Sequence, residues 1–152
     1  MFEALFGLLY LLLLVGFLAL MRALDLPLPT SIGSQDLLLL CLATFRLTEL
    51  VTYDRITRFL RDPFIRRVEI RKDDGTQEEE VEPAGSGLRR VVGELLICPW
   101  CTGIWAATGL TYFWVLAPGP ARVLMLALGV AGGGILLELI AKLLDQVIHR
   151  AE

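Results

Sequence analysis

Apolar residues along the chain form long blocks, and polar residues are concentrated in the segments between these blocks. A helix needs roughly 20 mostly apolar residues to cross the hydrocarbon layer of a bilayer. Four blocks approach this length with few charges inside them, and they span residues 2–24, 35–53, 98–117 and 121–144. The pattern therefore predicts an all-α membrane protein with four transmembrane helices.

The first block, residues 2–24, is expected to remain in the protein as a spanning helix. A cleaved signal peptide is the alternative, but no basic residue precedes the apolar run, and the run is longer than the apolar core of such a peptide. The third and fourth blocks are separated by Ala-Pro-Gly-Pro at residues 117–120, which is expected to stop a helix. The whole chain, residues 1–152, is expected to form a single polytopic domain.

The segment between the second and third spans, residues 54–97, shows three shorter patterns. Residues 54–64 and 87–97 place apolar side chains at helical spacing with arginines on the other face, which predicts two interfacial amphipathic helices. Between them, residues 68–81 alternate on either side of Asp74-Gly75, and this pattern predicts a small β-hairpin. A lone hairpin is marginally stable in water, so it is expected either to be mobile or to pair with a cytoplasmic partner protein.

Basic residues are distributed unevenly and therefore predict an orientation. Nine of the 14 Lys and Arg residues lie between the second and third spans, although the net charge of the chain is −3. The positive-inside rule places this segment in the cytoplasm, and four spans then place both termini there too. The arginines are interpreted as topology determinants and lipid head-group contacts, so no nucleic-acid partner is expected.

Three charged residues lie more than three residues from either end of a predicted span: Arg46 and Glu49 in the second, and Glu138 in the fourth. A charge near the middle of a bilayer costs at least about 2.5 kcal/mol, and pairing is the usual remedy. Both spans run toward the cytoplasm, so we expect Arg46 to contact Glu138, with Glu49 one helical turn away as the competing partner. A pair that fixes helix register and a pathway for ions or protons are both compatible with this network.

Small residues recur at four-residue spacing in the last two spans. Gly103 and Ala107 form one such stripe, and Gly129 and Gly133 form another. Stripes of small residues allow helix backbones to approach closely in a membrane. Close packing is therefore expected within the chain or between copies, and a homo-oligomer is one predicted outcome.

The third span begins with Cys98-Pro99-Trp100-Cys101, which has three interpretations. Pro99 suits the first turn of a helix and Cys98 can cap it, so the motif can simply start the span, with Trp100 and Trp105 as interfacial anchors. Thiols at a helix N-terminus also suit redox work, but no βαβ pattern surrounds them. Zinc prefers four N or S ligands, so a metal site would need a carboxylate such as Glu94 or a second chain at a homo-oligomer interface.

Two stretches resemble the YjcA-like family of small bacterial membrane proteins of unknown function, which includes a sporulation-associated member. The stretches are "LATFRLTELVTYDRITRFLRDPF", residues 42–64, and "GELLICPWCTGIW", residues 93–105. The resemblance implies a multi-pass protein of the bacterial inner membrane and brings no catalytic mechanism with it. The recurring family residues correspond here to Arg46, Thr48, Asp54, Cys98, Trp100, Cys101, Gly103 and Trp105.

Three classes of function remain open at this point. The first is a non-enzymatic helical bundle that self-associates or acts as a scaffold. The second is a membrane thiol redox or metal-thiolate protein that uses Cys98 and Cys101. The third is an oligomeric channel or transporter built around Arg46, Glu49 and Glu138.

Overall fold

The computed structural model of the chain describes residues 2–25, 32–71 and 77–151. The chain forms two compact units, Met1–Ser34 and Gln35–Glu152. The first unit contains helix α1, Phe2–Ala23, as the apolar pattern predicts. Its side chains from Leu8 to Leu20 are largely exposed apolar groups, which is the surface expected of a helix in contact with lipid.

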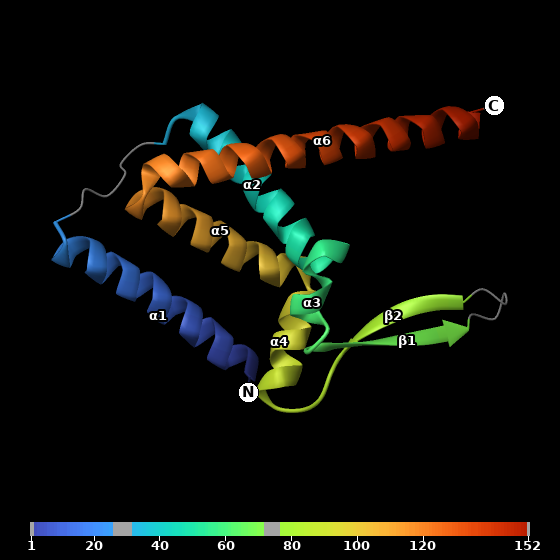
Figure 1. The fold of residues 1–152 in the computed structure, drawn as a ribbon, viewed down its shortest axis with the longest axis horizontal. Coiled ribbons are helices and arrows are strands. Elements are labelled where there is room, and N and C mark those ends of the chain that lie inside the picture. The colour runs from blue at the N-terminus through green and yellow to red at the C-terminus, as the bar shows by residue number, and fades with distance from the viewer. Residues whose placement is uncertain (1, 26–31, 72–76, 152) are drawn as a thin grey trace. The chain divides into compact units, whose positions relative to one another are not determined.

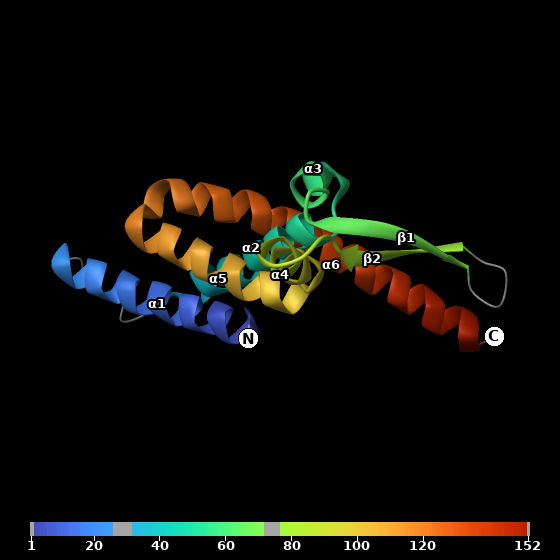
Figure 2. The same ribbon diagram turned by 90° about the horizontal axis from the view of Figure 1, so that it is seen from below.

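The second unit contains the other helices and a single two-stranded sheet among its described residues (Figures 1 and 2). The helices are α2 (Ser34–Thr52), the 3-10 helix η1 (Arg55–Thr57), α3 (Arg58–Arg61), α4 (Leu88–Ile97), α5 (Pro99–Leu116) and α6 (Pro118–Ala151). The strands are β1 (Ile65–Arg71) and β2 (Gln77–Pro83). A mainly helical fold with one small hairpin is therefore confirmed.

The core of the second unit lies where α2, α5 and α6 meet. Ala43, Leu110 and Met125 are buried there, one from each helix. Helices α5 and α6 pack as neighbours joined by the short turn at Ala117, and α2 crosses α6 (Figure 1). An ion pair of 2.9 Å between Arg122 and Asp36 joins the first turns of α6 and α2. The beginnings of these two helices therefore lie at the same end of the bundle.

The number of membrane spans differs from the four predicted. Helices α1 and α6 are long and apolar enough to cross a bilayer, and α4 with α5 forms a third span only if this bent pair counts as one. Helix α2 contains three charged residues, namely Asp36, Arg46 and Glu49, and α5 is rich in Thr, Tyr and Trp, so both are less apolar than α1 or α6. The structure thus supports two or three spans rather than clearly four.

The segment between α2 and α5 follows two of its three predicted patterns. Helix α4 and the hairpin form, and the register pairs Ile65 with Pro83 and Arg66 with Glu82. The predicted turn at Asp74-Gly75 lies outside the described residues. The first amphipathic helix is much shorter than expected, because residues 54–64 divide into η1, α3 and a turn at residues 62–64 that leads into β1.

A glycine holds α4 against the base of the hairpin. A Cβ atom on Gly93 would overlap the carbonyl oxygen of Phe64 and lie 3.1 Å from the Cβ of Pro83. Only glycine allows a helix backbone to approach another backbone this closely. Helix α4 and the two strands are therefore one packed element, since the backbone N–H of Ala84 also donates to the Phe64 carbonyl at 2.8 Å.

Candidate functional site

The Cys-Pro-Trp-Cys motif forms the junction between α4 and α5. The two helix axes differ by 90° there. Pro99 is the first residue of α5, and the backbone N–H of Cys101 donates to the Sγ atom of Cys98 at 3.4 Å. The predicted helix start, with Cys98 as its cap, is confirmed. The hydroxyl of Thr102 also donates to the carbonyl of Leu95 at 2.8 Å, so it fastens α5 to the last turn of α4.

The two thiols of this motif are free, with Cys98 half-buried and Cys101 exposed. Both sulfurs lie at the N-terminus of α5, Cys98 as its cap and Cys101 in its first turn. No group of three His, Cys, Asp or Glu side chains suited to a metal occurs within residues 2–25, 32–71 and 77–151. His149 lies near Asp145 on α6, with 3.5 Å between Nε2 and Oδ1. A zinc site at this motif would thus need ligands in addition to those that the described residues bring together.

The two tryptophans of the motif region differ in exposure. Trp100 is 89% exposed, as expected for an interfacial anchor, whereas Trp105 is half-buried. Beside Trp100, a shallow groove of about 260 Å³ separates the start of α5 from the second half of α2. Its lining combines residues from both helices: Phe45, Thr48, Glu49, Tyr53, Pro99 and Trp100.

Helices α2 and α5 contact each other at Thr48 and Gly103. These residues lie in the two stretches that resemble the YjcA-like family. A Cβ atom on Gly103 would lie 3.6 Å from the Oγ1 atom of Thr48, which is buried. The Thr48 hydroxyl itself donates to the Thr44 carbonyl at 2.8 Å. The predicted close approach at Gly103 is thus present within the chain, and one turn further along α5 Ala107 is half-buried.

The predicted pair between Arg46 and Glu138 does not form, and each charge has a different partner. The Nη2 atom of Arg46 lies 2.6 Å from the Oδ2 atom of Asp54. Glu138 pairs instead with Lys142 on α6 at 2.8 Å. Helix α2 ends at Thr52, and the turn that follows brings Asp54 back toward Arg46. Hydrophobic periodicity in the sequence does not predict this turn. Glu49, the other predicted partner, lines the groove beside Trp100.

The glycines of α6 are not equivalent. Gly129 and Gly132 face α2, and a Cβ atom on Gly132 would lie only 2.6 Å from the carbonyl oxygen of Leu42. The predicted stripe of Gly129 and Gly133 is therefore shifted, because Gly132 makes the tightest contact and a Cβ atom on Gly133 would meet nothing within 4 Å. The helix surface at Gly133 is open for another contact.

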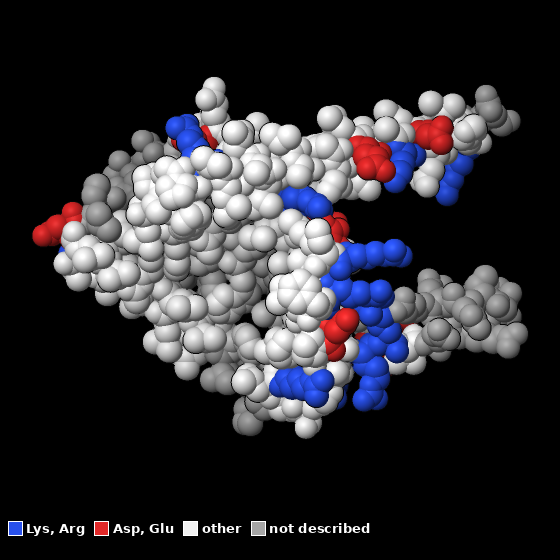
Figure 3. Space-filling model, viewed as in Figure 1, with Lys and Arg blue, Asp and Glu red and all other residues white. Residues whose placement is uncertain are grey.

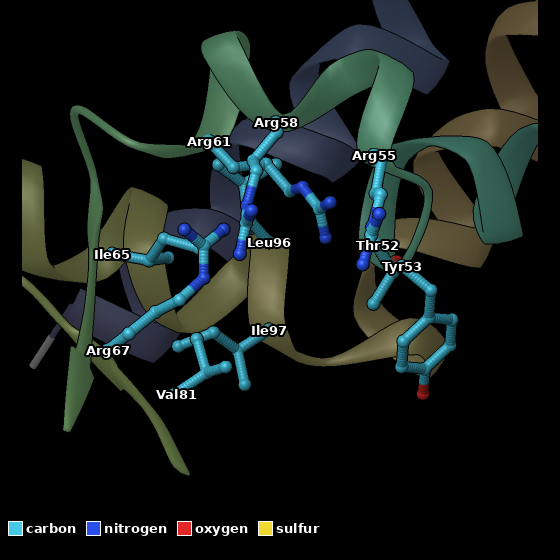
Figure 4. A pocket seen from close by; sticks show the side chains of 10 residues that line it. All are labelled: Thr52, Tyr53, Arg55, Arg58, Arg61, Ile65, Arg67, Val81, Leu96 and Ile97. Carbon is cyan, nitrogen blue, oxygen red and sulfur yellow. The ribbon is translucent and has the colours of Figure 1, made fainter. Parts of the chain in front are cut away.

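A pocket of about 310 Å³ lies between the end of α2, α3 and the base of the hairpin. Four arginine side chains from three elements point toward the same space (Figure 4): Arg55, Arg58, Arg61 and Arg67. Figure 3 shows Lys and Arg side chains gathered on this side of the second unit. Burial lowers the pKa of Arg61, and the positive charge of Arg67 acts in the same direction. We call this the arginine pocket.

From the sequence, these arginines were expected to determine topology and to contact lipid head groups, and a shared pocket was not predicted. Helical spacing suggested that Arg55, Arg58 and Arg61 lie on one face, and this was a signal that they could act together. Arg67 joins them because the hairpin folds back under α3, which depends on the short turn at residues 62–64. Such convergence of separate elements cannot be read from local spacing.

These features define a predominantly helical protein with two or three helices that are long and apolar enough to cross a membrane. The chain belongs to the family described as Protein of unknown function (DUF1360), whose model matches residues 39–141. This finding confirms the resemblance to YjcA-like proteins. The matched region covers most of α2, all of α5, the connection between them and most of α6.

Two relatives from Bacillus subtilis (strain 168) are similar to the chain. Sporulation protein YjcA is 39% identical over 116 residues, which cover 76% of this chain and 98% of the relative. UPF0713 protein YngL is 35% identical over 101 residues, which cover 66% of this chain and 74% of the relative. No solved structure matches the chain.

Proposed function

We propose that this protein is a non-enzymatic, self-associating membrane scaffold, in which α6 joins copies of the chain and the bundle presents the hairpin and arginine pocket in the cytoplasm. The observation that supports this most strongly is an apolar stripe along α6. Its members repeat at alternating steps of three and four residues and stay exposed in the single chain: Val123, Leu126, Val130, Leu137, Ile140, Leu144 and Val147. Gly133 occupies the remaining position of the repeat, where the surface is open.

The spacing of this stripe matches the a and d positions of a coiled coil. The exposed fraction is 71% at Val123 and 69% at Val130, although the first half of α6 buries its other face against α2, and it is 70% at Leu137 in the exposed second half. The charged residues of α6 lie off the stripe and alternate in sign, as Figure 3 shows along its second half: Glu138, Lys142, Asp145 and Arg150. Alternating charges beside an apolar seam favour a second copy of the same helix as the partner.

The length of α6 also supports this role. At 1.5 Å per residue, its 34 residues extend about 51 Å, compared with about 30 Å for the hydrocarbon core of a bilayer. The last turns therefore reach water even when the helix is tilted, and the stripe continues there through Leu144 and Val147. Contact between copies removes these apolar side chains from water and so lowers the free energy of the assembly. Side chains that face lipid have no such driving force.

The orientation in this proposal keeps all four predicted crossings. The charges of α2 are compatible with a membrane position because Asp36 pairs with Arg122 and Arg46 pairs with Asp54. Helices α2 and α6 then run from the outer to the inner face, and the nine basic residues between α2 and α5 lie in the cytoplasm. The relative named as a sporulation protein extends the proposed role to a scaffold in membranes of sporulating cells.

The test is the mass of the purified full-length chain in a mild detergent and in lipid nanodiscs. The wild-type protein should be a dimer or higher oligomer. The double variant Ile140→Ala with Val147→Ala should weaken association by about tenfold or more, because it removes apolar contacts between copies and no packing within one. Leu139→Ala, an exposed position off the stripe, is the matched control. A monomeric wild-type protein, or equal association of the double variant and the control, would refute the proposal.

The thiol hypothesis has no comparable support, since Cys98 and Cys101 act in the structure as the start of α5. The channel hypothesis loses its central element, because Arg46 and Glu138 are paired with different residues. Both remain distinguishable by experiment. Oligomerisation that survives Cys98→Ser with Cys101→Ser would separate the scaffold from a metal-thiolate assembly.

A further inference from the structure

The arginine pocket has a strong excess of positive charge. Its four arginines come from η1, α3 and β1, and no Asp or Glu is among the described residues that line it. Two carboxylates of the neighbouring turns pair with arginines: Asp62 lies 3.1 Å from Arg67, and Asp54 pairs with Arg46. Arg61 donates to the carbonyl oxygen of Asp54. The described lining of the pocket thus contains four guanidinium groups and no carboxylate.

Two polar side-chain atoms at this pocket are buried without a hydrogen-bond partner. They are the Nε atom of Arg61 and the Oγ1 atom of Thr52, and among the described residues these are the buried side-chain nitrogen and oxygen atoms left unsatisfied. Arg61 is 7% exposed and Thr52 is 6% exposed, so solvent does not satisfy either group in place. A buried polar atom without a partner is unfavourable, so a bound group that drew these side chains toward the pocket would satisfy both atoms.

The remaining walls of the pocket are apolar and come from Ile65, Val81, Leu96 and Ile97. Apolar surface beside the guanidinium groups lowers the local dielectric and strengthens their attraction to an anion bound there. A volume of about 310 Å³ is at the lower end of the range for small-ligand sites. The space accommodates a compact anion and a small group attached to it.

We propose that the arginine pocket binds a phosphate group, supplied either by the head group of an anionic phospholipid or by a small phosphorylated solute. Guanidinium groups form paired hydrogen bonds with the oxygens of phosphate, and several of them around one space suit an anion with oxygens in every direction. A bound phosphate would draw the Arg61 side chain into the pocket and give its Nε atom a partner. The Thr52 hydroxyl would supply a further donor from the last turn of α2.

The test uses the full-length protein in a neutral detergent, with inorganic phosphate as the soluble probe and chloride at equal ionic strength as its control. The lipid probe is a nanodisc that contains phosphatidylglycerol, compared with one that contains phosphatidylcholine alone. Binding is followed by the rise in melting temperature and, for phosphate, by titration. Arg58→Gln is the test variant, and Arg90→Gln is the matched control, since Arg90 lies on α4 outside the pocket and pairs with Glu94.

The wild-type protein and Arg90→Gln should be stabilised by phosphate, by phosphatidylglycerol or by both. Arg58→Gln should bind about tenfold to a hundredfold more weakly, because one charged donor is lost. Stabilisation by lipid alone would identify the phospholipid as the source, and stabilisation by phosphate alone would identify a solute. If Arg58→Gln misfolds, Arg55→Gln gives the same comparison from η1. No stabilisation of the wild type, or an equal response of the pocket and control variants, would overturn the proposal.

Discussion

Replacing Gly132 by alanine would test the contact between α2 and α6 directly. A Cβ atom at this position would lie 2.6 Å from the carbonyl oxygen of Leu42 and 3.2 Å from the Cβ atom of Arg46. Ordinary van der Waals contact begins near 3.4 Å, so the new atom is about 0.8 Å too close to a backbone oxygen. The two helices must separate to admit it, and the buried core around Ala43 and Met125 must open with them.

The magnitude follows from two opposing terms. Overpacking of a well-packed contact costs about 1–3 kcal/mol. Alanine also improves the intrinsic stability of a helix by about 1 kcal/mol relative to glycine. Gly134→Ala has the same helix gain, but its Cβ atom would meet nothing within 4 Å. The difference in unfolding free energy between Gly132→Ala and Gly134→Ala therefore isolates the steric cost, and we expect it to be about 1–3 kcal/mol.

The assay is thermal unfolding of both variants and the wild type in one detergent, followed by circular dichroism. Gly132→Ala should melt below Gly134→Ala, by about 2–4 °C for each kcal/mol in a chain of this size. Gly134→Ala should melt at or above the wild-type temperature. Equal melting temperatures for the two variants would show that α2 and α6 do not approach each other as described.

Three further predictions follow from the same structure. Asp54→Asn should lower stability by about 1 kcal/mol, because Arg46 loses a charged partner that is only partly exposed, and a double-mutant cycle with Arg46→Gln should give a coupling energy clearly above zero. Gly103→Ala should change the melting temperature little, since its Cβ atom would be in ordinary contact, whereas the larger side chain of Gly103→Leu should lower it; equal effects would contradict the contact with α2. A cysteine introduced at exposed Glu82 should resist an impermeant maleimide in intact cells, and one at Gly119 should react; the reverse pattern would invert the proposed topology.

Local sequence patterns predicted most of the elements, because each depends on residues close together in the chain. Pro99 and the prolines at 118 and 120 placed the ends of α5, and the alternation around residues 68–81 placed the hairpin. Helix α4 also follows its amphipathic pattern. The end of α6 was missed: it was expected near Leu144, but charged residues outside a membrane can continue a helix as well as apolar ones can.

The candidate site was less accessible to sequence analysis, since it depends on which elements converge. Arg46 was recognised as a buried charge that needs a partner, but Asp54 was assigned to an amphipathic helix instead of the turn that returns it to Arg46. Similarly, Arg61 and Arg67 share a pocket only because the strand folds back beneath α3. Pairing of charges across a turn is decided by backbone geometry, and hydrophobic periodicity contains no information about it.

The right angle between α4 and α5 has a mechanical consequence. If α5 crosses the bilayer, α4 lies parallel to the membrane surface, in the head-group region of the bilayer. Gly93 leaves no clearance between α4 and the chain at Phe64 and Pro83, so α4 cannot tilt without turning the hairpin. Changes in membrane curvature or lateral tension that tilt α4 would thus be converted into a rotation of the hairpin outside the membrane.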